Sequence, residues 1–243
     1  MLLFKKRNPN LELEKLLLPA LLLLLVILAY YNIIFLENAR PGRILKKTLS
    51  NMEQNYEHLE VEIIERGQGY RINFRGSLMD NKIYGKIPNY MLEIYKHSSG
   101  ELFAKDLTDG LWKSSAELKL DTLQEFFISP FELLGLWSHL FKEAKFVNYS
   151  AGKEKVVLLN ISPHELEKTA FLKDYLNQNP FWLECLIFIE PEELFINQII
   201  FSLYDKRNLE SILSRTFSLK CSGSYFPDVI PASILKEKEG VVY

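Results

Sequence analysis

The sequence contains little of several things that would mark a specialised class of protein. Two cysteines are too few for a disulfide scaffold or for a zinc site built from cysteine alone. Eleven glycines and ten prolines in 243 residues exclude a collagen-like or linker-dominated chain. The charges nearly cancel, with 29 Lys and Arg against 31 Asp and Glu. This balance excludes a generally basic nucleic-acid binder and an acidic disordered tail protein.

The sequence also lacks the short motifs that accompany catalysis and metal binding. It has no G-x-S-x-G nucleophile elbow, no phosphate-binding G-x-x-x-x-G-K-[ST] and no G-x-G-x-x-G. Glu190, Glu192 and Glu193 surround Pro191, which is more typical of a solvated turn than of paired acid/base carboxylates. The four histidines have no metal-ligand spacing and are His58, His97, His139 and His164. We therefore expect no metal, no cofactor and no enzymatic activity.

One long apolar run is present near the N-terminus. Residues 16–36 form 21 consecutive positions without a charge, including five leucines from Leu21 to Leu25. A helix of this length spans about 30 Å, which is the thickness of the bilayer hydrocarbon. We expect an uncleaved transmembrane signal anchor. The alternatives are a cleaved signal peptide, although its apolar region is usually shorter and Asn38-Ala39-Arg40 is a poor cleavage site, and a buried core helix.

The charges that flank this run do not decide its orientation. Four basic residues precede it, Lys5, Lys6, Arg7 and Lys15, and four follow it, Arg40, Arg43, Lys46 and Lys47. The positive-inside rule therefore favours neither orientation of the helix in the membrane. A short N-terminal tail followed by a large domain most often leaves the domain outside the cell. We expect a single-pass protein of the cell membrane with an extracytoplasmic C-terminal domain.

The remainder of the chain suits one domain with a full core. Residues 1–43 carry six Lys or Arg and three Asp or Glu, so the other 200 residues carry 23 and 28 and have a net charge of -5. The expected segments are a tail at 1–15, the anchor at 16–36, a connecting helix at 37–58, a β-rich domain at 59–226 and a peripheral tail at 227–243.

Alternating apolar and polar residues predict strands through most of this domain. Residues 70–76 alternate strictly, as half-buried strands do, and Asp109-Gly110 is a typical hairpin turn. Short links between strands favour an antiparallel meander over a βαβ series. The expected strands are 61–65, 70–76, 82–87, 91–96, 101–105, 111–113, 146–149, 155–161, 181–189, 194–204 and 211–221.

Helical spacing interrupts the strands at three places. Apolar residues recur every three or four positions from Arg43 to Leu59. Ser129-Pro130-Phe131-Glu132 is a capping box, and the segments 128–133 and 161–166 match at five of six positions. Because the match extends no further, it indicates one helix start used twice. The fold class is therefore α+β, mainly antiparallel β: a curved sheet of about eleven strands covered by two or three helices, after one transmembrane helix.

This arrangement resembles the LolA/LppX-type superfamily of bacterial lipoprotein carriers and lipid-binding envelope proteins. The segment 84–112 carries the resemblance, with 90–95 leading into a Ser-Gly turn and 101–106 leading to Thr108-Asp-Gly-Leu-Trp-Lys113. Ser129-Pro130 before a helix is similar to the family's mid-chain helix. The chain differs from many members in having no Cys after its apolar run. The resemblance implies a half-barrel with helices across its mouth and an apolar cavity inside.

A cavity of this kind implies a function in binding lipid. Its expected ligand is a lipid or the acyl chain of a lipoprotein, held by burial of apolar surface for envelope transport or sensing. The alternative is a non-enzymatic module that binds another envelope protein in secretion, sporulation or signal regulation. We expect no nucleic-acid partner. The expected cavity residues are Tyr70, Ile72, Phe74, Leu92, Ile94, Trp137, Phe141, Leu183, Ile187, Phe201, Phe217 and Leu219.

The two cysteines each fall on an apolar strand face, so both are expected to point inward. Cys185 shares its face with Leu183 and Ile187, and Cys221 shares its face with Phe217 and Leu219. A disulfide is permitted if the domain is extracytoplasmic. Two buried free thiols are the plainer interpretation.

Overall fold

The structure is a computed structural model. It describes residues 19, 21–28, 30, 40–79, 81–108, 110–118, 121–148, 153–169, 171–172, 181–207 and 209–222. Residues 21–28, within the expected anchor, are helical and exposed. Among the residues described, no helix is both long enough and apolar enough to cross a bilayer. The expected tails at 1–15 and 227–243 lie outside the described residues.

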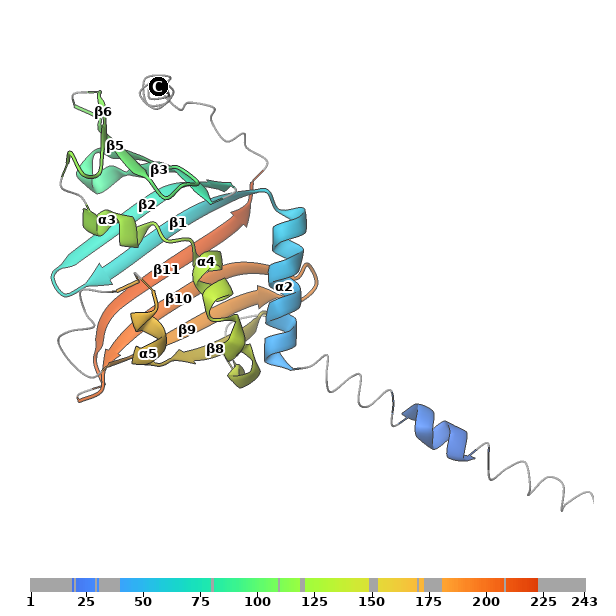
Figure 1. The fold of residues 1–243 in the computed structure, drawn as a ribbon. Coiled ribbons are helices and arrows are strands. Elements are labelled where there is room, and N and C mark those ends of the chain that lie inside the picture. Colours follow the sequence, from blue (N-terminus) through green and yellow to red (C-terminus); the bar gives the residue numbers. More distant parts are fainter. Residues whose placement is uncertain are drawn as a thin grey trace, which may run out of the picture.

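Eleven antiparallel strands form one curved, open sheet (Figure 1). Their order across the sheet is β6-β5-β4-β3-β2-β1-β11-β10-β9-β8-β7, so the chain closes the middle of the sheet by pairing β1 with β11. The strands are β1 (His58–Gly67), β2 (Tyr70–Met79), β3 (Lys82–Ile87), β4 (Leu92–Lys96), β5 (Leu102–Asp106), β6 (Trp112–Ser114), β7 (Lys145–Val147), β8 (Lys155–Ile161), β9 (Phe181–Glu190), β10 (Phe195–Asp205) and β11 (Ser211–Cys221).

The expected sheet is confirmed, including its number of strands. The bounds of β3, β8 and β11 are those that the alternation predicts. The count of helices was too low: besides the helical residues 21–28, the described residues form four α-helices and two 3-10 helices. They are α2 (Pro41–Asn55), α3 (Asp121–Phe126), α4 (Pro130–Leu136), α5 (Pro163–Glu167), η1 (Pro88–Tyr90) and η2 (Ser138–Glu143). The additional helices have six residues or fewer, too short to show a helical period.

The helices α2, α3, α4 and α5 lie across the same face of the sheet (Figure 1). We call this the concave face, and the core lies between it and the helices. Alternate residues of the central strands point into that core, as Val61 and Ile63 do on β1 and Phe217 and Leu219 do on β11. Burial of these side chains supplies the main free energy of folding, at about 25 cal/mol per Å² of apolar surface.

Two glycine sites let the backbone come close where the fold needs it. At the start of α2, a Cβ on Gly42 would lie 2.0 Å from the Phe141 carbonyl oxygen, so this end of α2 packs tightly on η2. On the concave face Gly76 pairs with Gly85 across β2 and β3, and the Phe74 ring covers both. The covering ring replaces the contacts that glycine lacks in a strand.

The repeated Ser-Pro helix starts are found where the capping boxes predict them. Pro130 opens α4 and Pro163 opens α5. The Ser162 hydroxyl accepts a hydrogen bond from the Glu165 N–H, as a cap should. The Ser129 side chain makes no such bond, although it occupies the same position. The predicted caps are therefore correct in place, and one of the two is correct in its hydrogen bond.

Candidate functional site

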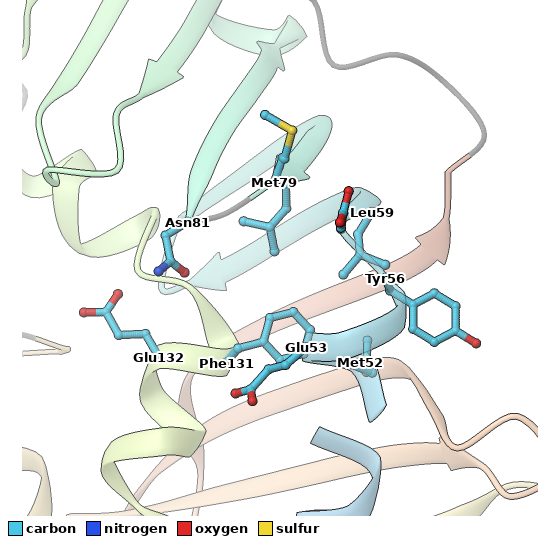
Figure 2. Close-up of a pocket in the computed structure, with 10 residues that line it drawn as sticks. Met52, Glu53, Tyr56, Leu59, Met79, Asn81, Phe131 and Glu132 are labelled. Atoms are coloured by element: carbon cyan, nitrogen blue, oxygen red, sulfur yellow. The ribbon is translucent and has the colours of Figure 1, made fainter. Parts of the chain in front are cut away.

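A pocket of about 340 Å³ opens between the C-terminal half of α2, the start of α4 and the ends of β1 and β2. Figure 2 shows side chains from these elements converging on one space. We call this region the pocket end of the concave face. Its lining residues are Met52, Glu53, Tyr56, Glu57, Leu59, Leu78, Met79, Asn81, Phe131 and Glu132. Ligand pockets usually have volumes of about 300–1,000 Å³, so this one is large enough for a small ligand or part of a larger one.

The floor of the pocket is the protein core itself. Leu59 and Leu78 face each other across β1 and β2, and Met52 packs above them from α2. All three belong to the continuous buried cluster between sheet and helices, and each is less than 10% exposed. Phe131, from the first turn of α4, packs partly buried against the same cluster. An apolar ligand in the pocket would therefore contact the core directly.

The other side of α2 is fixed to the turn between β9 and β10. The Asn51 side-chain amide donates to the carbonyl oxygens of Glu193 and Leu194, at 3.1 and 3.2 Å. The Ile196 N–H donates to the Met52 sulfur at 3.2 Å, and the ring centroids of Tyr56 and Phe195 lie 5.0 Å apart. These contacts hold the pocket wall formed by α2 in place.

The rim of the pocket is acidic. Glu53, Glu57 and Glu132 line it, and none of them forms an ion pair within the described part of the chain. The Glu132 carboxylate interacts electrostatically with Lys96. Burial lowers the pKa of the Lys96 ammonium group, and the Glu132 carboxylate opposes that shift. Its Nζ donates to the Phe127 carbonyl oxygen at 2.9 Å.

At the opposite end of β1, a buried ion pair joins the sheet to the helices. Nε and Nη2 of Arg215 both lie 2.5 Å from the same oxygen of Glu65, and both side chains are at least 94% buried. The Tyr70 hydroxyl donates to the other Glu65 oxygen at 2.8 Å. We call this region the paired end of the concave face.

The remaining contacts of Arg215 reach the covering segments. Its Nη1 donates to the Glu125 carbonyl oxygen in α3 at 2.7 Å. The guanidinium carbon lies 5.3 Å from the Phe126 ring centroid and 4.8 Å from that of Phe171. These are cation–π distances, and such contacts gain strength when water is excluded. Arg215 therefore binds α3 and the segment around Phe171 to the middle of the sheet.

The predicted cavity residues lie mostly in the packed core. Trp137, Phe201 and Phe217 form one aromatic series with Phe171, with successive ring centroids 5.2–6.2 Å apart. The other buried members are Phe74, Ile94, Phe141, Leu183, Ile187 and Leu219. Ile72 and Leu92 are partly buried, and Tyr70 is 36% exposed. None of the twelve lines the pocket between α2 and α4, and their role as a cavity wall remains a prediction.

Sequence reasoning missed both ends of the concave face. Glu65 and Arg215 each stand at an apolar position of an alternating strand, and this break in the pattern was the available signal. Met52 and Tyr56 were recognised as the apolar side of a helix, but the pocket beside them depends on where α4 begins. No local pattern contains that information.

The two cysteines are free thiols. Cys185 is buried on β9, where burial raises the pKa of its thiol well above the usual value. Cys221 is exposed at the end of β11, which corrects the expectation that it points inward. Cys185 on β9 pairs with Phe201 on β10, which in turn pairs with Arg215 on β11. Arg215 is six residues from Cys221 along β11. The register therefore separates the two thiols along the sheet as well as across it, which explains why the permitted disulfide is not formed.

The described residues contain no group of three or more His, Cys, Asp or Glu side chains placed to hold a metal ion. The predicted turn carboxylates Glu190 and Glu193 lie beside α2, where their charges contribute to raising the pKa of Tyr56, after the larger effect of burial.

Comparison with solved structures finds similar folds at very low sequence identity. The crystal structure of the Mycobacterium tuberculosis lipoprotein LppX matches with a TM-score of 0.45 and 9% identity, covering 76% of this chain and 98% of that one. A Vibrio parahaemolyticus structure described as an outer membrane lipoprotein-sorting protein domain matches with a TM-score of 0.38 and 10% identity, covering 81% and 98%. A DUF1329 family protein from Desulfovibrio piger matches with a TM-score of 0.32 and 8% identity, covering 83% and 99%.

No family model matches the sequence, and no curated protein sequence matches it significantly. The eleven-stranded curved sheet with helices across one face is the architecture that the LolA/LppX resemblance predicts, and this fold is confirmed.

Proposed function

We propose that this chain is a membrane-tethered, extracytoplasmic protein that binds the acyl chain of a lipid or lipoprotein, without catalysis, in envelope transport or sensing. The observation that supports this function is the pocket end, where Met52, Leu59 and Leu78 are at once pocket floor and protein core. An acyl chain inserted there exchanges water for apolar side chains. The gain is about 25 cal/mol for each Å² of apolar surface buried.

The contacts of α2 and α4 suggest how the pocket can lengthen. Side-chain hydrogen bonds hold α2 on the turn between β9 and β10, whereas Phe131 and Glu132 of α4 line the pocket without a side-chain hydrogen bond among the described residues. Movement of α4 away from α2 would extend the pocket along the core towards Trp137, at the end of α4. The predicted cavity residues would then become accessible to the ligand.

Photolabelling of the full chain tests this function. The chain is placed in phosphatidylcholine nanodiscs that contain phosphatidylcholine with a diazirine and an alkyne on one acyl chain. We expect labelled peptides from residues 45–57 and 129–134, in addition to any from the apolar run. Phe131→Asp puts a charge on the apolar wall and should reduce labelling of the pocket peptides several-fold.

The matched control is Phe146→Asp, which adds the same charge to an exposed phenylalanine of β7, outside the pocket. It should leave the labelling unchanged. Labelling confined to the apolar run, or equal loss of labelling in the two variants, would contradict acyl-chain binding in this pocket.

The tether and its orientation can be read from the cysteines. Cys221 is exposed and accessible to a thiol reagent, whereas Cys185 is buried and should not be labelled. In cells stripped to their cytoplasmic membrane, a membrane-impermeant maleimide should label Cys221 once per chain, and the protein should resist alkaline extraction. Labelling that requires lysis would place the domain inside the cell and overturn the proposed topology.

A second candidate function, binding of another envelope protein, is favoured by one surface feature. Two neighbouring turns expose large apolar side chains: Met91 before β4 and Leu107 after β5, joined by a 2.9 Å hydrogen bond from the Leu107 N–H to the Met91 carbonyl. Tyr90 and Leu111 are exposed in the same turns. A photo-crosslinker at position 91 should trap one stoichiometric protein in cells, and trapping of lipid alone would exclude this function for the turns.

A further inference from the structure

The pocket end combines an apolar floor with a rim of one charge sign. Glu53 lies in the last turn of α2, Glu57 lies between α2 and β1, and Glu132 lies in the first turn of α4. Figure 2 shows Glu53 next to Phe131, and Glu132 beyond Phe131 with its carboxylate pointing away from Met52 and Leu59. A ligand that fills the pocket must therefore bring its polar end past these carboxylates.

The charges around the rim are mostly negative as well. Glu190 and Glu193 act on Tyr56 from the turn between β9 and β10, beyond the α2 wall. The opposing cation is Lys96, which is partly buried and already donates to the Phe127 carbonyl. A rim of this charge attracts a cationic group and repels a phosphate, sulfate or carboxylate.

A second and independent feature also points to a ligand. The Thr48 hydroxyl is fully buried and has no hydrogen-bond partner among the described residues. Thr48 lies one turn before the pocket residue Met52 on the buried face of α2, and it does not itself line the pocket. The Ser129 hydroxyl, two residues before Phe131, is also buried and unpaired in the described structure. Buried hydroxyls normally have partners, so each of these two can donate to a ligand group that reaches it when the pocket lengthens.

We propose that the ligand of the pocket end is a cationic acyl ester or amide, with its chain on the core floor, its carbonyl near the Thr48 hydroxyl and its positive head group at the rim of Glu53, Glu57 and Glu132. This inference rests on the proposed acyl-chain function and names the class of ligand. The carbonyl accepts a hydrogen bond that the fold leaves unmade, and the head group meets carboxylates that no other residue of the described chain neutralises by an ion pair.

Three probes that differ only in head-group charge test the proposal. They are the choline, glycol and isethionate esters of one diazirine- and alkyne-bearing palmitic acid, and so are cationic, neutral and anionic at every working pH. Each is added to the full chain in phosphatidylcholine nanodiscs. We expect the choline ester to label the pocket peptides about ten-fold more than the isethionate ester at low salt, and the difference to shrink as salt screens the rim.

Charge variants identify the source of this preference. The triple variant Glu53→Gln, Glu57→Gln, Glu132→Gln should label equally with all three probes. The control triple variant Glu143→Gln, Glu167→Gln, Glu192→Gln removes the same charge from exposed positions outside the pocket and should keep the preference. Equal labelling of the wild type by the three probes would overturn the cationic selectivity alone, whereas absence of pocket labelling by every probe would overturn the acyl-chain function itself.

Thr48→Val separates a ligand-binding hydroxyl from a structural one. Valine has the same shape and removes the unpaired hydroxyl, so the variant should melt at a higher temperature while its labelling by the choline ester falls several-fold. Unchanged labelling would contradict the role of Thr48 in binding. A lower melting temperature would show that the hydroxyl has a structural partner and would contradict the proposal equally.

Discussion

The two ends of the concave face treat buried polar groups in opposite ways. Glu65 and Leu59 lie six residues apart on β1, a distance of about 20 Å along the strand. At the paired end, the Glu65 carboxylate and the Arg215 guanidinium are satisfied by each other, by Tyr70 and by a carbonyl of α3. At the pocket end, Thr48 is buried without a hydrogen-bond partner among the described residues.

This difference separates a structural role from a binding role. A buried charge with all its partners present fixes the position of the covering segments and has nothing left to offer a ligand. A buried hydroxyl without a partner reduces stability, and a pocket beside it gives a ligand the opportunity to supply that partner. We therefore assign stability to the paired end and binding to the pocket end.

The largest expected effect is loss of the buried ion pair. Glu65→Leu and Arg215→Met each leave one charge buried and unpaired, which should lower the free energy of unfolding by about 3–5 kcal/mol. Urea titration of the full chain, followed by the fluorescence of buried Trp137, measures the change. The double variant Glu65→Leu, Arg215→Met should recover most of the loss. A double variant as unstable as the sum of the single ones would show that the two residues do not act as a pair.

Two buried threonines give a matched comparison between the ends. The Thr169 hydroxyl donates to the Leu166 carbonyl at 2.9 Å and accepts from the Phe171 N–H at 3.3 Å, whereas the Thr48 hydroxyl has no partner among the described residues. Thr169→Val should lower the free energy of unfolding by about 1 kcal/mol, and Thr48→Val should raise it by about 1 kcal/mol. Shifts of the same sign in the two thermal melts would break the distinction between the ends.

A smaller effect is expected at the exposed side of the paired end. Tyr70→Phe removes the hydrogen bond to Glu65 and should lower the free energy of unfolding by about 0.5–1.5 kcal/mol. In the Glu65→Leu background the same change should have a smaller effect on urea unfolding, because the hydrogen bond to Glu65 is already gone. An equal loss in both backgrounds would show that the Tyr70 hydroxyl acts elsewhere.

The sequence predicts the sheet well because each strand has its own local pattern of alternating apolar and polar residues. The alternation from Lys155 to Ile161 and from Ser211 to Cys221 gives the observed bounds of β8 and β11, since one face of each strand is buried. The short helix α3 escaped prediction because fewer than two turns carry no clear period. The second Ser-Pro start predicts a longer helix than α5, which ends at Glu167.

The site was predicted far less completely than the fold. The alternation of apolar and polar residues along the strands identifies Phe201 and Phe217 as inward-facing. Residues of a packed core and of a cavity wall, however, have the same pattern in sequence. The unpaired state of Thr48 and the presence of Glu53 and Glu132 around one pocket depend on how α2 and α4 cross the sheet. These are tertiary facts, and the nearest signal in the sequence was a polar residue between Leu45 and Met52 on the apolar side of a helix.

Hydrogen–deuterium exchange of the full chain in nanodiscs, with and without the choline ester of palmitic acid, tests the division between the two ends most directly. If the pocket end is the binding end, the ester slows exchange in residues 45–57 and 129–134 and leaves the amides around Glu65 and Arg215 unchanged. Protection centred on Glu65 and Arg215, or no change in residues 45–57 at a saturating ester concentration, would contradict this assignment.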